Sequence, residues 1–95
     1  MTPEKKVKNL VVKQLKEIGA YYFFPATGGY GRSGVPDVVG CWKGRFFAIE
    51  CKAGNNTTTA LQELELKKIQ EVGGVAWVVN EQNMDSVKAA IYSFR

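Results

Sequence analysis

The first twenty residues carry apolar side chains at helical spacing. Thr2 and Pro3 are residue types that begin a helix, and Gly19 is a type that ends one. Apolar residues recur every three or four positions between them: Val7, Leu10, Val11, Leu15 and Ile18. This spacing gathers them on one stripe of a helix. The pattern therefore predicts an amphipathic helix that starts after Thr2 and stops before Gly19.

Three runs of β-forming residues follow this helix. They are Tyr21–Phe24, Val35–Trp42 and Arg45–Lys52. A glycine-rich loop separates the first run from the second. Lys43-Gly44 separates the second run from the third, and a two-residue connection of this kind favours a hairpin. We therefore expect the second and third runs to pair as antiparallel strands.

The remaining chain alternates between helix and strand. Thr59 and Gln62 match a capping box that opens a helix, and Gly73-Gly74 ends that helix. Val75–Val79 shows no polar alternation, which is typical of a parallel strand buried on both faces. A last apolar stripe predicts a C-terminal helix: Met84, Val87, Ile91 and Phe94. The predicted order is αβββαβα, an α/β fold with a mixed central sheet flanked by helices.

The composition limits both the size of the fold and its chemistry. At 95 residues the chain should form a single domain, residues 1–95. Its net charge of +4 favours an anionic partner such as a nucleic acid. Histidine is absent, which excludes histidine-based catalytic triads and histidine-ligated zinc. Cys41 and Cys51 are too few for a four-thiolate metal site, and we expect both to be reduced.

The sequence gives no sign of a membrane segment. Its longest apolar runs, Tyr21–Phe24 and Val75–Val79, are far shorter than the roughly 20 residues that span a bilayer. The N-terminus lacks the apolar core of a signal peptide. We therefore expect a soluble, cytoplasmic protein without a membrane partner.

The hairpin register brings two carboxylates together. With Lys43-Gly44 as the loop, opposing residues have numbers that sum to 87, so Asp37 faces Glu50. Two negative charges about 5 Å apart repel by roughly 3 kcal/mol at an effective dielectric of about 20. Lys52 points to the same face as Glu50, but one ammonium group cannot offset both charges. A divalent cation can offset both.

Two interpretations of this carboxylate pair are open. Oxygen ligands without histidine or thiolate are typical of Mg²⁺ or Mn²⁺ sites that also bind substrate phosphate. In the structural interpretation, Asp37 starts a turn after Pro36, while Glu50 and Lys52 lie on a solvated strand face. The apolar neighbours of these residues favour the metal site, because internal strands rarely hold unpaired charges.

These residues resemble the signature of the PD-(D/E)XK nucleases. Pro36-Asp37 and Glu50-Cys51-Lys52 match its two parts, and the predicted element order is similar to the restriction-endonuclease-like core of that superfamily. Gly34-Val35 before the first part, Gln62 on the next helix and the Gly73-Gly74 helix end look like a VRR-NUC (virus-type replication–repair nuclease) domain. This resemblance covers nearly the whole chain, and stand-alone domains of this length are typical of its phage and bacterial members.

The resemblance implies a role for each matching residue. Asp37, Glu50 and the backbone carbonyl of Cys51 would hold the metal ion, Mg²⁺ or Mn²⁺. Lys52 would orient the attacking water or help to deprotonate it. Glu4 matches an acidic residue on the first helix of such nucleases, where it would bind metal through water or assist a second ion. Its alternative role is to interact favourably with the helix dipole in the first turn.

Other polar residues also have a structural and a functional interpretation. Gln62 can cap its helix, but it also lies on the inward stripe of that helix, which favours a role beside the active site. Arg32 and Ser33 directly precede the metal motif and are candidate DNA phosphate contacts. Five lysines of the first helix are interpreted first as a solvated face: Lys5, Lys6, Lys8, Lys13 and Lys16.

Residues and resemblance together predict a metal-dependent DNA endonuclease that hydrolyses phosphodiesters. A preference for branched or Holliday-junction DNA, with a role in DNA repair, is implied by the resemblance alone. We expect a homodimer, because a two-fold pair buries more surface than a small domain can and offers two sites to two strands. If the chain is phage-encoded, it acts in the host cytoplasm. Two alternatives remain open: a non-catalytic DNA-binding module of the same fold, and a restriction-type nuclease with another DNA target.

Overall fold

A computed structural model describes residues 1–26 and 33–93 of the chain. The elements are α1 (Pro3–Glu17), β1 (Tyr21–Phe23), β2 (Val38–Trp42), β3 (Arg45–Cys51), α2 (Ala60–Glu71), β4 (Val75–Val79), the 3₁₀ turn η1 (Met84–Ser86) and α3 (Val87–Tyr92). This order confirms the predicted αβββαβα arrangement. The last predicted core residue, Phe94, lies outside the described residues.

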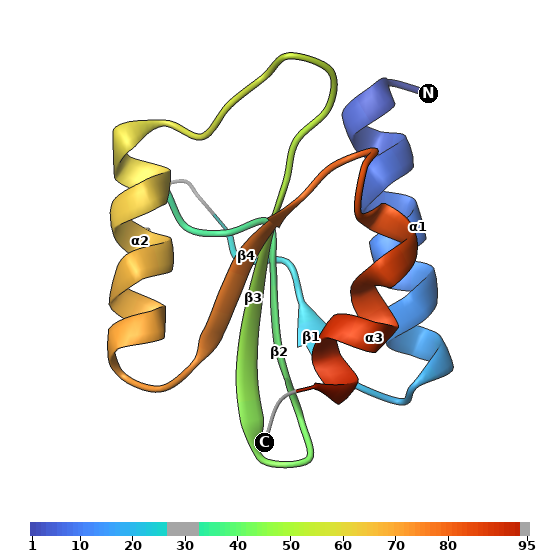
Figure 1. Cartoon of the computed structure of the whole chain (residues 1–95), viewed down its shortest axis with the longest axis vertical. Coiled ribbons are helices and arrows are strands. Elements are labelled where there is room, and N and C mark those ends of the chain that lie inside the picture. The colour runs from blue at the N-terminus through green and yellow to red at the C-terminus, as the bar shows by residue number, and fades with distance from the viewer. Residues whose placement is uncertain (27–32, 94–95) are drawn as a thin grey trace.

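The four strands form one mixed sheet with helices on both faces. The strand order is β1-β2-β3-β4; β1, β2 and β3 pair antiparallel, and β4 runs parallel to β3. Figure 1 shows α2 on one face of the sheet and α1 and α3 together on the other. The predicted α/β class with a mixed central sheet is confirmed.

The β2–β3 hairpin has the register that its turn predicts. Trp42 pairs with Arg45, and Val38 pairs with Ile49 at the other end of the ladder. Lys43 and Gly44 both have positive φ, 49° and 81°. That conformation matches the twist of the flanking strands in a two-residue turn, and glycine adopts it without steric cost.

The predicted strand over Val35–Trp42 is too long at its start, because β2 begins only at Val38. Pro36 has no backbone N–H and cannot donate to a ladder. The Oδ2 atom of Asp37 accepts a hydrogen bond from the backbone N–H of Cys51 at 2.8 Å. The side chain of Asp37, rather than its backbone, therefore ends the pairing with β3. The ladder keeps the predicted register but ends at Val38 and Ile49, one position before Asp37 and Glu50, whose carboxyl groups still interact.

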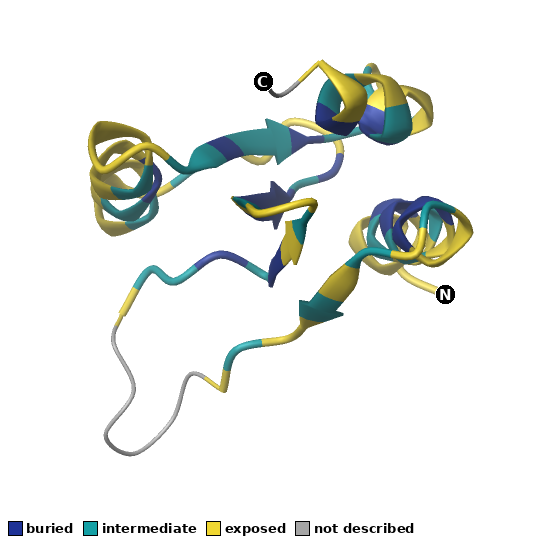
Figure 2. Ribbon diagram, turned by 90° about the horizontal axis from the view of Figure 1, so that it is seen from below, coloured by how far each residue is buried: buried dark blue, intermediate teal, exposed yellow. Residues whose placement is uncertain are grey.

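Each face of the sheet buries its own apolar cluster (Figure 2). The larger cluster lies under α1 and α3 and comprises Val7, Val11, Leu15, Val38, Phe47, Ile49, Cys51, Ala53, Val79, Val87 and Ile91. The smaller cluster lies under α2 and comprises Val39, Ala48, Leu66 and Ala76. Alternate residues of β3 thus enter opposite clusters, as the two-residue period of a strand requires. By the same alternation, Glu50 lies on the α2 face.

β4 is less buried than its apolar sequence predicts. Ala76 and Val79 are buried, but Val75, Trp77 and Val78 are only half-buried. The parallel pairing with β3 is confirmed, whereas burial on both faces is wrong. The reason is topological, since β4 forms the edge of the sheet and has a neighbour on one side only.

A buried glutamine joins α1 to the C-terminal segment. Gln14 is 4% exposed. Its Nε2 donates to the carbonyl oxygens of Leu10, at 3.2 Å, and Met84, at 2.6 Å. Its Oε1 accepts from the backbone N–H of Lys88 at 3.2 Å. The amide therefore satisfies backbone groups where η1 meets α3, whose own Ser86 N-cap forms no side-chain hydrogen bond.

Replacing this glutamine should destabilise the protein. Gln14→Leu leaves the Met84 carbonyl and the Lys88 N–H without their partner, and each unsatisfied buried group costs about 1–3 kcal/mol. We expect the free energy of unfolding to fall by about 2–4 kcal/mol in urea titrations. Lys13→Leu, at an exposed neighbouring position, should change it by less than about 0.5 kcal/mol. Equal effects in the two variants would contradict this role of Gln14.

Candidate active site

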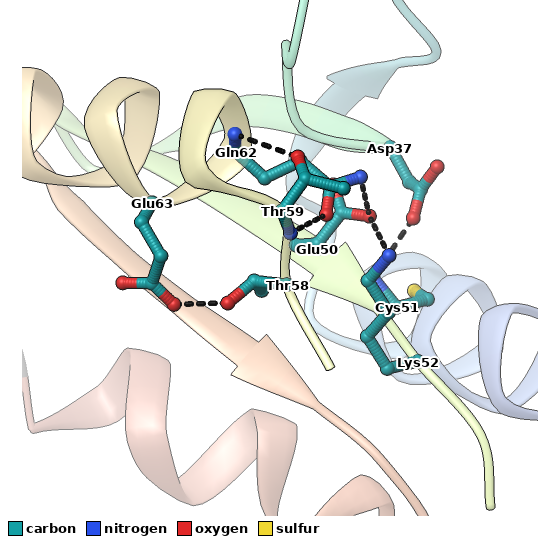
Figure 3. A network of polar contacts seen from close by, with 8 residues as sticks. All are labelled: Asp37, Glu50, Cys51, Lys52, Thr58, Thr59, Gln62 and Glu63. Carbon is teal, nitrogen blue, oxygen red and sulfur yellow. Dashed lines mark hydrogen bonds and ion pairs between the residues drawn. The ribbon is translucent and has the colours of Figure 1, made fainter. Parts of the chain in front are cut away.

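Glu50 is the centre of a polar network at the C-terminal end of β3 (Figure 3). Its side chain is buried, with the residue only 3% exposed. Oε2 accepts a hydrogen bond from Nε2 of Gln62 at 3.1 Å and lies 3.7 Å from Nζ of Lys52. Oε1 is also buried but has no hydrogen-bond partner among residues 1–26 and 33–93. Within these residues, one carboxylate oxygen of Glu50 is therefore left without a donor.

The surroundings of Glu50 disfavour the ionised form of its carboxyl group. Burial, and after it the negative charge of Asp37, raise the pKa of this carboxyl to about 7. Lys52 acts in the opposite direction, and Glu4 adds a smaller increase. The network therefore lacks enough positive charge to offset its carboxylates, and a cation bound among them would favour their ionised forms.

This pKa predicts a pH-dependent stability in metal-free protein. A folded-state pKa of about 7 lies above the ordinary value of 4.5. The folded state thus binds more protons than the unfolded state between those values, and stability falls as pH rises through that window. The loss from Glu50 is about 3 kcal/mol, because one pKa unit corresponds to about 1.4 kcal/mol.

Urea unfolding in EDTA between pH 4.5 and 8 measures this loss. Glu50→Gln has no titrating group at this position, so its stability relative to wild type should rise steadily over the window. Mg²⁺ added at pH 8 should then stabilise wild type but not Glu50→Gln. Parallel pH curves for the two proteins would contradict the raised pKa.

The segment before β2 holds Asp37 beside Glu50. Gly34 has a positive φ of 79°, and a Cβ at this position would lie 2.7 Å from the backbone of Leu61. Glycine therefore lets this segment pack closely against the first turn of α2. Pro36 is buried, and Asp37 is half-buried with its carboxylate on the Cys51 amide. Chain segments far apart in sequence thus bring Asp37 and Glu50 together.

Gln62 both caps its helix and contacts Glu50. Its Oε1 accepts from the backbone N–H of Thr59 at 2.9 Å, and the Thr59 hydroxyl accepts from the Gln62 N–H at 3.2 Å. These two bonds form the predicted capping box. The amide nitrogen at the other end of the same side chain reaches Glu50. The capping bond therefore orients the amide that holds Glu50.

Lys52 and Glu4 approach the pair from two directions. Lys52 follows β3, its side chain is 14% exposed, and its backbone N–H donates to Val79 at 3.0 Å. Glu4, in the first turn of α1, lines one pocket together with Asp37 and Cys51. The structure thus brings together five of the residues named from the sequence: Glu4, Asp37, Glu50, Lys52 and Gln62.

The two candidate phosphate contacts are not brought into the network. Ser33 is exposed and has no hydrogen bond with the carboxylate pair among the described residues. Arg32 lies outside the described residues, together with most of the glycine-rich loop. The unpaired Glu50 oxygen was not predictable from the sequence, because its burial depends on how distant segments of the chain pack around β3.

The donor set fits a hard divalent cation. Mg²⁺ and Mn²⁺ bind through one or two carboxylates, backbone carbonyls, waters and substrate phosphate. Asp37 and Glu50 supply the carboxylates, and the unpaired Oε1 is a buried acceptor that a cation would satisfy. Among residues 1–26 and 33–93, no three His, Cys, Asp or Glu side chains gather as a metal cluster. Water and substrate oxygens would have to complete the coordination.

Family comparison identifies the class of protein that carries this site. Residues 5–88 match the family model for the archaeal Holliday junction resolvase (hjc). The chain belongs to this family. Hjc proteins are Holliday junction resolvases, which are structure-specific DNA endonucleases with the PD-(D/E)XK fold. Membership makes the chain a nuclease of the endodeoxyribonuclease class.

The Hjc match includes the central residues of the site. Asp37, Glu50, Lys52 and Gln62 lie inside the matched segment, which begins one residue after Glu4. The match supports the predicted superfamily, although it does not select the VRR-NUC type within it. No curated protein is detectably similar to the chain. In the described part of the chain, every helix is too short or too polar to cross a membrane.

Proposed function

We propose that this Hjc-family chain cuts branched DNA, above all four-way junctions, by metal-dependent hydrolysis at the site around Glu50. The observation that carries the proposal is the buried Glu50 carboxylate, with one oxygen unpaired beside Asp37. A buried acceptor without a donor is costly to a fold. A bound cation would satisfy this acceptor. The proposed substrate, branched DNA, is the substrate class of the Hjc family.

Each residue of the network has a distinct task in this proposal. Asp37, Glu50 and the Cys51 carbonyl would hold Mg²⁺ or Mn²⁺, with Glu4 joining through a water molecule. Gln62 keeps one Glu50 oxygen in place, which leaves the other for the metal. When bound, the cation would lower the pKa of a water molecule and offset negative charge on the phosphate oxygens.

Lys52 would contact the reacting groups themselves. Its ammonium lies within reach of the Glu50 carboxylate and can donate to the attacking water or to a phosphate oxygen. In the reaction, the water oxygen bonds to phosphorus, one ester P–O bond breaks, and the leaving oxygen gains a proton. A fixed positive charge at this point stabilises the extra negative charge of the transition state.

We also propose that residues 1–95 contain one nuclease domain of VRR-NUC type, acting on DNA in the cytoplasm. The Gly34-Val35-Pro36-Asp37 motif supports this type, and Gly34 is the residue that packs against α2.

The chain would act as a homodimer, because a four-way junction offers two strands related by two-fold symmetry. Exposed aromatic side chains on the sheet give such a dimer apolar surface: Tyr21, Phe23 and Phe46. Light scattering on the purified protein tests the dimer, and a monomeric mass would contradict it.

A cleavage assay with matched substrates tests the proposed activity. A four-way junction, a splayed duplex, a flap and a linear duplex are built from the same strands and incubated with Mg²⁺, Mn²⁺ or EDTA. We expect junction cleavage with either metal, none in EDTA, and little cleavage of linear duplex. Junction binding without cleavage would instead identify a non-catalytic module. Preferred cleavage of linear duplex at one sequence would identify a restriction-type nuclease.

A further inference from the structure

A pocket of about 430 Å³ connects the candidate metal centre to the basic N-terminal half of α1. Asp37 and Cys51 line it on the side of the sheet. Lys5 and Lys8 line it from α1, and Phe24 lines it from the segment that follows β1. The pocket therefore has the Asp37 carboxylate on the sheet side, while α1 contributes the ammonium groups of Lys5 and Lys8 together with the carboxylate of Glu4.

Lys8 differs from an ordinary surface lysine in its contacts. Its Nζ lies 4.3 Å from the centroid of the Phe24 ring, which is well within the distance of a cation–π interaction. The residue is half-buried. It forms no ion pair with a carboxylate among residues 1–26 and 33–93. An aromatic ring thus holds the ammonium while leaving it without an anionic partner.

Lys8 faces the candidate metal centre across this pocket. Its side chain lines the pocket from α1, while Asp37 and Cys51 line it from the sheet. Lys8 therefore lies on the side of α1 that faces the end of β3.

We propose that Lys8 contacts a DNA phosphate beside the bond to be cut and that Phe24 positions the Lys8 side chain for this contact. The proposal rests on the proposed DNA cleavage at Glu50 and adds a substrate-positioning pair to it. Glu4, Asp37 and Glu50 would repel a phosphate backbone if no positive charge lay beside them. A lysine loses much rotamer freedom when it is fixed, so a ring that orders it beforehand lowers the cost of binding.

Four variants distinguish the contributions of Lys8 and Phe24 from the effect of the overall positive charge of α1. Lys8→Gln removes the charge, and Lys8→Arg keeps both charge and ring contact. Phe24→Leu removes the ring but keeps apolar bulk. Lys13→Gln is the matched control, since it removes one charge from an exposed position on another side of α1. Circular dichroism and melting curves establish that each variant is folded.

The experiment measures the affinity of each variant for a four-way junction across a salt series, and its kcat and KM in steady-state cleavage. Loss of one phosphate contact should reduce the slope of log K against log salt by about 0.9 in Lys8→Gln. KM should rise while kcat stays near wild type, because the contact is made equally in the ground and transition states. Phe24→Leu should lower affinity by about two- to fivefold. Lys8→Arg and Lys13→Gln should retain the wild-type slope and KM.

Several outcomes would overturn the proposal. A wild-type slope and KM in Lys8→Gln would show that Lys8 stays in water. Equal losses in Lys8→Gln and Lys13→Gln would show a general charge effect. Unchanged affinity in Phe24→Leu would remove the positioning role of the ring. Should Lys8→Gln fail to fold, Lys8→Met, which keeps the aliphatic stem, is judged by the same slope.

The test also distinguishes failure of this proposal from failure of the proposed function. If wild type cleaves no branched DNA, the function fails, while the salt slope of DNA binding still reports on Lys8. If wild type cleaves junctions and Lys8→Gln behaves as Lys13→Gln does, only the Lys8 inference fails.

Discussion

Asp37→Asn and Glu50→Gln should each reduce junction cleavage by about a thousandfold or more. Either change removes one of the two carboxylates that would hold the cation, and a bound metal ion is worth several kcal/mol in the transition state. A loss of about 4 kcal/mol corresponds to a rate reduction of about a thousandfold. Neither variant should unfold, because each relieves the repulsion that raises the pKa of Glu50. Single-turnover cleavage at saturating Mg²⁺ measures the effect.

Matched controls exist outside the network. Asp85→Asn and Glu71→Gln make the same chemical changes at exposed positions, and both should cleave at the wild-type rate. A wild-type rate in Asp37→Asn or in Glu50→Gln would remove the proposed metal ligands. A uniform loss in all four variants would point to net charge and DNA affinity instead.

Lys52→Met should reduce the cleavage rate on bound junction by about a hundredfold or more, the range of a positioned proton-transfer or charge-stabilising group. Methionine keeps the length and the aliphatic stem, so packing at the end of β3 is retained. Junction affinity should stay near that of Lys67→Met, which removes an exposed lysine from α2. Comparing affinity with single-turnover rate decides the role of Lys52. If affinity collapses while the rate on bound DNA is unchanged, Lys52 binds substrate and does not serve the chemistry.

The sequence predicted those parts of the fold that depend on local rules. A two-residue loop at Lys43-Gly44 sets the hairpin register, because side-chain alternation leaves no freedom once the turn is fixed. Thr59 and Gln62 define the start of α2 through bonds between near neighbours. The stripe from Val7 to Leu15 buries α1 for the same reason, since helical spacing alone gathers those residues.

The sequence did not predict features that depend on packing between distant segments. The start of β2 at Val38 follows from the Asp37 side chain accepting the hydrogen bond of the Cys51 N–H, a contact across 14 positions. The exposure of β4 follows from its place at the sheet edge, which its apolar sequence does not reveal. Gln14 is polar, but two of its three partners, Met84 and Lys88, lie 70 or more positions away, and these bonds make its burial favourable.

The site was predictable in its residue types and not in its electrostatics. Asp37, Glu50 and Lys52 could be named from spacing and from family resemblance. The unpaired Glu50 oxygen and the raised pKa require α2 to cover the end of β3. The contact between Lys8 and Phe24 requires α1 to lie beside β1, and the lysine pattern alone favours a solvated face.

The location of a bound metal ion decides whether Asp37 and Glu50 form a metal site. Crystals of the protein grown with Mn²⁺ and measured at a wavelength where manganese scatters anomalously report the position of the ion without any assay of activity. We expect one anomalous peak in contact with Asp37 and Glu50, absent from Glu50→Gln crystals grown in the same way. Manganese bound elsewhere on the protein, with Asp37 still on the Cys51 amide and Glu50 Oε1 still unpaired, would contradict this expectation.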